Sequence, residues 1–303
     1  MDKISLVICT YNRDKYLPKA LQSIKQQTID KDLYELIVVD NNSTDNTAAI
    51  VNEFTAENAE INCRYCFEGQ KGLSFARNRG IKEAAFDIIT YTDDDALLQP
   101  EYLQHMSDFF TAHPEAAGVG GKVIPQYEDG KEPVWMSRYL NGFVGKVDYG
   151  NEIIMYDEKM KYPAGCNMTY KKDILIKAGG FNNDLTFRSD DKYIFYKVKA
   201  ISTAIYYNPF TWLYHIIDDA RLQKTSFEKL FLKTGNEEKK RLLSEKNTSG
   251  LVSKFLGYCI KLMASLLIFL KFLITGQYLK GKYLVLAQWY SLKGFMAKNV
   301  FVR

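Results

Sequence analysis

The feature that most constrains the fold is a regular alternation of short apolar runs and amphipathic segments within the first 95 residues. Between the runs, apolar side chains recur at helical spacing around residues 16–24, 48–54 and 73–85. Strands that alternate with helices pair in parallel, and their crossovers put helices on both faces of the sheet. The sequence therefore predicts an α/β fold whose strands are the apolar runs at 4–9, 36–39, 61–67 and 88–91.

Polar clusters follow the first, second and fourth of these runs directly. They are Thr10-Tyr11-Asn12-Arg13, Asp40-Asn41-Asn42-Ser43-Thr44-Asp45 and Thr92-Asp93-Asp94-Asp95. In an open parallel sheet the carboxyl ends of the strands meet at one edge, where ligands bind. Each cluster alone is compatible with an ordinary loop, but together they predict one binding site.

Three adjacent carboxylates, Asp93, Asp94 and Asp95, are the most informative part of this site. Carboxylates roughly 5 Å apart repel each other by about 3 kcal/mol per pair at an effective dielectric of 20. A divalent cation would offset that repulsion, and oxygen ligands favour Mg²⁺ or Mn²⁺. The alternative is a solvated acidic turn. Two neighbours favour the cation, because Asp40 could accept hydrogen bonds from a nucleoside and Arg77 could offer donors to a phosphate.

Four segments, in this order, resemble the family 2 glycosyltransferases. That family has the GT-A fold, a Rossmann-like and mostly parallel sheet with helices on both faces. The resemblance covers residues 1 to about 235 and is carried by Val7-Ile8-Cys9-Thr10-Tyr11-Asn12-Arg13, Ile37-Val38-Val39-Asp40-Asn41-Asn42-Ser43-Thr44-Asp45, Gly72-Leu73-Ser74-Phe75-Ala76-Arg77-Asn78 and Thr92-Asp93-Asp94-Asp95.

The resemblance implies roles on the donor side. Thr10 and Tyr11 would border the nucleobase, and Asp40 would hydrogen-bond it. Asp95 would be the metal ligand of the acidic triplet, while its two neighbours would contact the ribose and the transferred sugar. The implied donor-binding residues are Thr10, Tyr11, Asn12, Arg13, Asp40, Gly72, Arg77, Asp93 and Asp94.

The resemblance extends to an acceptor side in the second half of the chain. Ala164-Gly165-Cys166-Asn167-Met168-Thr169-Tyr170 is similar to the family's Gly-x-Asn-Met strand, which makes Gly165 and Asn167 acceptor-side residues. Asp190 stands where relatives usually have Glu and joins this set. Asp191, at a predicted helix N-terminus, would be the catalytic base, although capping that helix is the alternative role. His215 would meet the metal or the diphosphate.

These residues together predict an inverting, metal-dependent transferase. It would move one sugar from a nucleotide sugar, with UDP favoured by the resemblance, to a hydroxyl of a glycan or lipid-linked acceptor in cell-surface polysaccharide or glycolipid assembly. The family's processive synthases carry Gln-x-x-Arg-Trp, a spacing that Gln288-Trp289 lacks. The alternatives are a non-catalytic nucleotide-sugar-binding protein and a sugar nucleotidyltransferase. A Rossmann oxidoreductase would need Gly-x-Gly-x-x-Gly after the first strand, and residues 9–13 contain no glycine.

The C-terminal segment differs from the rest of the chain in charge. Residues 246–303 contain eight Lys, one Arg and no Asp or Glu, a charge of +9, which leaves 4 − 9 = −5 for residues 1–245. Residues 255–274 are apolar for about the length of a membrane span, but Lys261 and Lys271 interrupt them. These features predict a helical extension that lies on an anionic membrane surface; packing on the catalytic domain is the alternative.

The predicted organisation has three parts. Residues 1–120 form the nucleotide-sugar-binding half and 121–245 the acceptor-binding half of one GT-A domain, while 246–303 form the basic tail. The hydrophilic run at 235–250 is predicted to mark the boundary before the tail. The five cysteines are an odd, scattered set, which favours a reducing compartment, and Cys63-x-x-Cys66 lacks a second ligand pair for zinc. With no room for a signal peptide before the first strand, we expect a cytoplasmic protein on the inner face of the cell membrane. No nucleic-acid partner is expected.

Overall fold

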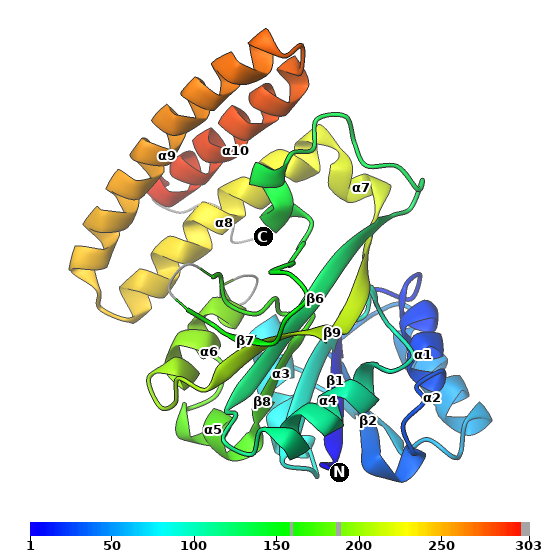
Figure 1. Ribbon diagram of the computed structural model, residues 1–303. Helices are drawn as coiled ribbons and strands as arrows, with labels where there is room; N and C mark the ends of the chain where they lie inside the picture. Colours follow the sequence, from blue (N-terminus) through cyan, green and yellow to red (C-terminus); the bar gives the residue numbers. More distant parts are fainter. Residues whose placement is uncertain (158–159, 186–188, 298–303) are drawn as a thin grey trace. The chain divides into compact units, whose positions relative to one another are not determined.

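The structure is a computed structural model that describes residues 1–157, 160–185 and 189–297 (Figure 1). It has two compact units. The first, called the α/β unit below, comprises Met1–Pro125, Gly145–Thr186 and Asp190–Ile216. The second, called the helical unit, contains Gln126–Val144 and the chain from Ile217 onward.

The first half of the α/β unit is a parallel sheet. Its order is β3-β2-β1-β4, with β1 pairing in parallel with both β2 and β4. Every residue of β1 and of β2 is buried, as expected for central strands covered on both faces. The strands are β1 (Ile4–Thr10), β2 (Tyr34–Asp40), β3 (Cys63–Phe67) and β4 (Ile88–Asp93). The four predicted strands are confirmed.

The sheet continues with strands that the sequence pattern did not resolve. β8 runs antiparallel to both β4 and β6, and β9 runs antiparallel to β5 and β7. The sheet order is completed by β4-β8-β6-β9-β5. These strands are β5 (Ala96–Leu98), β6 (Gly118–Tyr127), β7 (Ile154–Met155), β8 (Met168–Lys171) and β9 (Ile205–Ile217).

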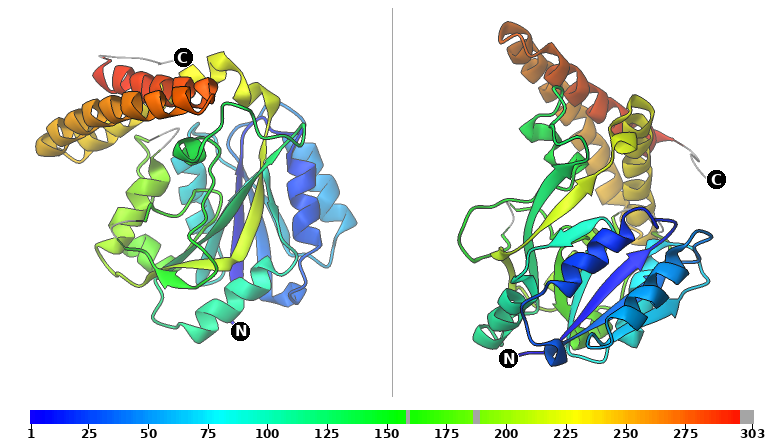
Figure 2. Two further views of the ribbon diagram at one scale, coloured as in Figure 1. Left: turned by 45° about the horizontal axis from the view of Figure 1, so that its top comes forward. Right: turned by 90° about the vertical axis from the view of Figure 1, so that its right-hand side faces the viewer.

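Helices cover both faces of the sheet, as predicted, because alternate residues of β1 point to opposite sides. Ile4, Leu6 and Ile8 pack in a core with α1, α2 and α4, whereas Val7 and Cys9 pack in a second core with α3, α5 and α6. Figure 2 (left) shows α1 and α2 in blue beside one face and α5 and α6 in green beside the other. The helices are α1 (Leu17–Lys25), α2 (Thr47–Glu57), α3 (Leu73–Glu83), α4 (Tyr102–Ala112), α5 (Lys172–Lys177) and α6 (Asp190–Lys199).

The helical unit is built around three long helices, coloured yellow, orange and red in Figure 1. α10 packs against both α8 and α9. The approach of α8 to α10 is so close that a Cβ on Gly235 would lie 2.0 Å from the carbonyl oxygen of Ser291, and one on Gly294 would lie 2.0 Å from that of Leu232. The helices are α7 (Asp219–Leu222), α8 (Lys224–Ser244), α9 (Thr248–Ile274) and α10 (Tyr278–Met296), with the 3₁₀ turn η2 (Arg138–Phe143).

The start of the helical unit differs from the predicted boundary at residue 246. The polar run at 235–250 was expected to separate domains, but its first ten residues continue α8. Two of its charged residues, Glu238 and Arg241, are buried and paired: Glu238 lies 3.1 Å from both Arg241 and Lys254, and Arg241 lies 2.8 Å from Glu245. Apolar contacts also join α8 to the tail, including Leu242 with Phe295. The tail is therefore one packed unit with α8.

Candidate active site

The predicted polar clusters meet at one edge of the sheet. In the parallel register Thr10, the last residue of β1, lies opposite Asp40, the last residue of β2. On the other side of β1, Cys9 lies opposite Asp93, the last residue of β4. Three loops that are far apart in the sequence therefore begin at neighbouring points of the carboxyl edge of the sheet.

Asp40 is buried and held by two hydrogen bonds. Its Oδ1 accepts from the backbone N–H of Ser43 at 2.8 Å, and its Oδ2 accepts from the Tyr65 hydroxyl at 2.8 Å. Burial and the adjacent Asp40 raise the pKa of Tyr65 to about 12, so this hydroxyl stays a donor. The sequence reasoning missed Tyr65; its place on β3, next to β2, was the available signal. These bonds fix the position of the Asp40 carboxylate.

The loops above this edge are tied to one another. Asn12, at φ 53°, accepts a hydrogen bond from the N–H of Thr44 at 2.7 Å through its side-chain oxygen. Asn41 likewise accepts from the N–H of Gly72 at 2.7 Å, and Gly72 has a φ of 142° that favours glycine. Tyr11 is exposed, with the Lys71 ammonium 5.1 Å above its ring. Predicted donor residues in the segments that follow β1, β2 and β3 are thus brought together.

Two of the three adjacent carboxylates are buried and form ion pairs with an arginine side chain. The side chains of Asp94 and Asp95 are 9% and 8% exposed, whereas that of Asp93 is 35% exposed. The Arg13 guanidinium bonds both buried carboxylates, through Nε to Asp94 at 3.2 Å and through Nη2 to Asp95. Burial and the charge of Asp95 raise the pKa of Asp94 to about 7, although Arg13 acts in the opposite direction. The acidic triplet is therefore no solvated turn.

His215 lies beside Asp95, with its Nε2 3.4 Å from the carboxylate Oδ1. The cause is strand register: β5 follows Asp95 directly and pairs with β9 so that Ala96 lies opposite His215. A glycine at 145 leaves room for the ring, since a Cβ there would lie 3.1 Å from His215 Nδ1. The predicted pair of Asp95 and His215 is thus adjacent in space.

Arg77 is buried and bonded within the protein. Its guanidinium pairs with Asp190, lies 3.7 Å from Asp93 and donates to the carbonyl oxygen of Gly165 at 3.1 Å. Glycine is needed at 165 because a Cβ there would come within 2.6 Å of Arg77 Nη2. Arg77 therefore joins the first half of the site to Asp190 in the second half, a role that its spacing in the sequence did not reveal.

The adjacent acids of α6 differ in environment. Asp190 is buried against Arg77, whereas Asp191 is partly exposed in the first turn of α6 and its Oδ1 accepts from the N–H of Lys192 at 2.7 Å. The positive end of the helix stabilises the ionised form of such a carboxylate. Of the two carboxylates, that of Asp191 is therefore the more accessible to solvent.

Asn167 is completely buried. Its side-chain NH₂ donates to the carbonyl oxygens of Lys122 and Thr211 at 3.1 and 2.9 Å, and its oxygen accepts from the Tyr102 hydroxyl at 2.8 Å. The side chain therefore connects four segments of the α/β unit and, being fully buried, presents no atom to solvent.

The charges of this cluster suit a divalent cation. Arg13 and Arg77 contact four carboxylates, those of Asp93, Asp94, Asp95 and Asp190, so the group has a formal charge of 2 − 4 = −2 when all four are ionised. Carboxylate and imidazole are donors that Mn²⁺ accepts, and the former suits Mg²⁺. Within the described residues, no group of three or more His, Cys, Asp or Glu side chains is arranged to hold a metal ion. Asp95 and His215 thus offer two protein ligands.

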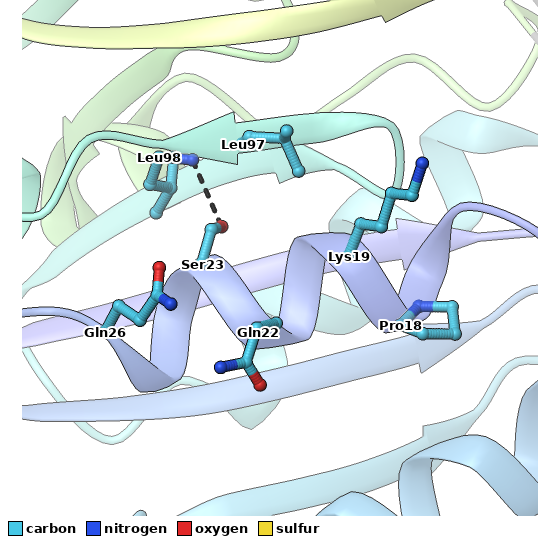
Figure 3. Close-up of a pocket in the computed structure, with 7 residues that line it drawn as sticks. All are labelled: Pro18, Lys19, Gln22, Ser23, Gln26, Leu97 and Leu98. Atoms are coloured by element: carbon cyan, nitrogen blue, oxygen red, sulfur yellow. Dashed lines mark hydrogen bonds between the residues drawn. The ribbon is translucent and has the colours of Figure 1, made fainter.

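A separate hollow lies between α1 and β5, away from these carboxylates (Figure 3). It is open to solvent, has a volume of about 380 Å³ and is shaped by the hydrogen bond from the Leu98 N–H to the Ser23 hydroxyl at 3.1 Å. Lys19 is its one charged side chain, so it has no counterpart of the acidic cluster. Its lining residues are Pro18, Lys19, Gln22, Ser23, Gln26, Leu97 and Leu98.

A sheet that is parallel in its first half and antiparallel in its second, with carboxylates at the switch between them, is the GT-A fold of nucleotide-sugar-dependent glycosyltransferases. Sequence comparison agrees with the fold. The family profile described as Glycosyl transferase family 2 matches residues 5–179. The chain belongs to this family.

Individual proteins are similar to this chain over different lengths. The glucosyl-dolichyl phosphate glucuronosyltransferase of Haloferax volcanii is 25% identical over 194 residues, covering 63% of this chain and 59% of that protein. The chain thus spans less than two thirds of that relative.

Solved structures share the fold. A mannosyltransferase from Pyrobaculum calidifontis, in complex with GDP-Man and Mn²⁺, superposes with a TM-score of 0.64 at 15% identity and covers 96% of this chain and 87% of its own. Residues 1–349 of S. aureus TarS, in complex with UDP-GlcNAc, give a TM-score of 0.58 at 19% identity, with 79% of this chain and 66% of the other covered.

Proposed function

We propose that this chain moves a single sugar, with inversion, from a nucleotide sugar to an acceptor hydroxyl, and that a UDP-sugar is the favoured donor. The proposal rests on the two buried carboxylates of Asp94 and Asp95, which lie beside His215, and on Asp191 in the same α/β unit. Membership of family 2 supports transfer over nucleotide-sugar binding alone or nucleotidyl transfer.

In this proposal the loops after β1 and β2 hold the nucleotide. Tyr11 offers an exposed ring to the base, and Asp40, fixed by Ser43 and Tyr65, offers a carboxylate to its polar edge. Asp93, the most exposed of the acidic triplet, faces the ribose and the sugar. Arg77, predicted to approach the nucleotide, acts instead through Asp93 and Asp190, which it positions.

Asp191 is the proposed base. It removes the proton from the acceptor hydroxyl as that oxygen attacks the anomeric carbon, and the bond from that carbon to the nucleoside diphosphate breaks with the electron pair leaving on the phosphate oxygen. The product sugar is therefore inverted. Asp190 is held by Arg77 one residue before the base, so the ion pair fixes the start of α6.

Asp95 and His215 would hold Mg²⁺ or Mn²⁺ in this reaction, with the diphosphate and water completing the coordination. A divalent cation supplies charge neutralisation for the departing diphosphate. The charge of −2 in the surrounding cluster supports this role.

The proposed acceptor is a glycan or a lipid-linked sugar. The similarity to an enzyme named for a glucosyl-dolichyl phosphate substrate supports the lipid-linked class. The long apolar helix α9 (Thr248–Ile274) also supports it. Such an acceptor belongs to the assembly of cell-surface glycans.

Donor binding should depend on the metal and on Asp95. We expect one nucleotide sugar of a panel to raise the melting temperature when Mn²⁺ is present, since a ligand at about 100 times its Kd adds about 2.7 kcal/mol of stability. Asp95→Asn should lose most of this increase, and Asp108→Asn, at an exposed position on α4, should keep it. The check is thermal unfolding with Mn²⁺ or with EDTA. A panel in which no donor stabilises the protein, or equal stabilisation of Asp95→Asn, would contradict the proposed site.

We further propose that the helical unit binds an anionic membrane surface through α9, and that the protein is peripheral on the cytoplasmic face. By length and composition α9 is able to cross a membrane, yet one side of it packs on its neighbours through Tyr258 and Ser265. The other side exposes apolar residues, and residues 246–303 have no acid. A helix with one face packed and one apolar face exposed suits the interface. The exposed apolar residues of α9 are Val252, Phe255, Leu256, Ile260, Met263, Leu266, Leu267, Leu270, Leu273 and Ile274.

Glutamates on this exposed face should abolish vesicle binding. We expect the wild-type protein to float with vesicles that contain phosphatidylglycerol, and the variant Ile260→Glu/Met263→Glu/Leu267→Glu to stay behind, because charged groups resist transfer into the interface. Deleting the tail is a poorer test, since Phe227 of α8 packs against Ala287 of α10.

The matched control for this experiment places the same three negative charges at exposed polar positions at the two ends of α8, outside α9, as Gln223→Glu/Thr225→Glu/Ser244→Glu. It should float like the wild type. Flotation of the apolar-face variant at the wild-type level would overturn the membrane proposal and leave the transferase proposal unaffected.

A further inference from the structure

The side chain of Arg13 lies where a cation for the acidic triplet is needed. Its guanidinium bonds Asp94 through Nε and Asp95 through Nη2. Of the two oxygens of Asp95, Oδ2 therefore faces Arg13, and Oδ1 lies 3.4 Å from His215 Nε2. A metal ion held by Asp95 and His215 would have to enter beside a guanidinium that already neutralises one of its ligands.

The backbone of Arg13 is fixed by its neighbours. The N–H of Asn12 donates to the Ser43 hydroxyl at 3.0 Å, and the N–H of Asp14 donates to Asp45 at 3.0 Å. The carbonyl oxygen of Arg13 accepts from the N–H groups of two residues at the start of α1, at 3.0 and 3.1 Å. Displacement of the guanidinium therefore requires rotation of the side chain and no movement of the loop.

The two arginines of the cluster differ in how firmly they are held. The side chain of Arg77 is 3% exposed and is bound by Asp190, Asp93 and the carbonyl of Gly165. The side chain of Arg13 is 32% exposed, and its guanidinium, while bonded to Asp94 and Asp95, also lies 4.6 Å from the centre of the Tyr16 ring on its open side. Arg13 is consequently the counter-charge that can leave.

We infer that Arg13 is a displaceable counter-cation: it neutralises Asp94 and Asp95 when no metal is bound and releases Asp95 when a divalent cation binds. The inference rests on the proposed metal use and adds a positioning residue that sets metal affinity. Without a cation the adjacent carboxylates would repel each other and spread, so Arg13 keeps the ligand in place. Arg13 also lowers the affinity of the site for a divalent ion, because the ion and the guanidinium compete for the same carboxylate and repel each other.

The test is calorimetric titration of the purified full chain with Mn²⁺ alone, without nucleotide. Arg13→Gln should bind Mn²⁺ on the order of tenfold more tightly, since one positive charge at ion-pair distance is removed from the site. Arg13→Lys keeps the charge and should stay closer to the wild type. Arg79→Gln removes one charge from an arginine that is 34% exposed and pairs with Glu83 at 2.8 Å; this control should change the affinity less than about twofold.

A thermal measurement guards against a folding defect. In EDTA, Arg13→Gln should melt below the wild type, because its carboxylates then lack their counter-charge, and Mn²⁺ should raise its melting temperature by more than it raises that of the wild type. Unchanged or weaker Mn²⁺ binding by Arg13→Gln, or no binding by either protein, overturns the inference. Sugar transfer by the wild type is measured separately, so failure here is distinguishable from failure of the proposed function.

Discussion

Replacing Asp191 by Asn should lower kcat by about 10²–10⁴-fold while the donor still binds, because an amide cannot accept the proton of the acceptor hydroxyl. Asn preserves the size of the side chain, and its oxygen can still accept the 2.7 Å hydrogen bond from Lys192 at the start of α6. The helix and the buried Asp190–Arg77 pair should therefore survive. Turnover is measured as release of nucleoside diphosphate in the presence of acceptor. Donor affinity is measured separately by thermal shift.

The control for Asp191→Asn is Asp184→Asn, a change of the same chemistry at an exposed acid earlier in the chain. It should leave turnover within about twofold, as surface substitutions usually have small effects. Near-normal turnover by Asp191→Asn would remove Asp191 from the role of base. Equal loss of donor affinity and turnover would instead mean that the carboxylate only caps α6 and holds the site together.

Local pattern was sufficient for the first half of the fold. The buried runs of β1 and β2 and the polar residues after them are adjacent in the sequence, and parallel pairing brings Thr10 next to Asp40 without further information. The acids at 93–95 are the same kind of signal, because they directly follow a predicted strand. Each depends on residues within one turn or one strand end.

What could not be predicted depends on contacts between distant segments. Arg77 looked like a ligand for phosphate because a charged residue in a helix is usually exposed, yet it is bonded to Asp190, 113 positions away. The His215–Asp95 contact requires the register of β5 against β9, which the family resemblance supplied and periodicity did not. The bond from Tyr65 to Asp40 requires the register of β3 against β2; the predicted strand order places Tyr65 near Asp40 but does not give that register.

The polar run at 235–250 failed as a boundary for a similar reason. Charged residues usually mark solvent, and Glu238 and Arg241 carry no local sign that they are buried. Their spacing of three residues allows an ion pair on one helix face, but burial follows from α10 and from Lys254 of α9 packing over that face. Composition alone therefore predicted a linker at residues 235–250, whereas residues 235–244 belong to α8.

Arg77→Gln should destabilise the α/β unit by about 3–5 kcal/mol, because it leaves the buried carboxylate of Asp190 without its counter-charge. Asp190→Asn should also destabilise it, since Arg77 would keep only Asp93, 3.7 Å away, as an acidic partner. The double variant should lose clearly less than the sum of the two, because it buries no unpaired charge. Urea unfolding of the four proteins gives the coupling free energy directly.

Arg79→Gln is the matched control for Arg77→Gln, two residues later on the same helix but partly exposed and paired with Glu83. An exposed pair of this kind contributes about 0.2–1 kcal/mol, so its loss should be small. If Arg77 were instead a direct ligand of the nucleotide, its loss would weaken donor binding and leave the unfolding free energy unchanged. The buried ion pair predicts the opposite result: Arg77→Gln lowers the free energy of unfolding. Donor binding and turnover then fall only indirectly, because Asp93 and the start of α6 lose their positions.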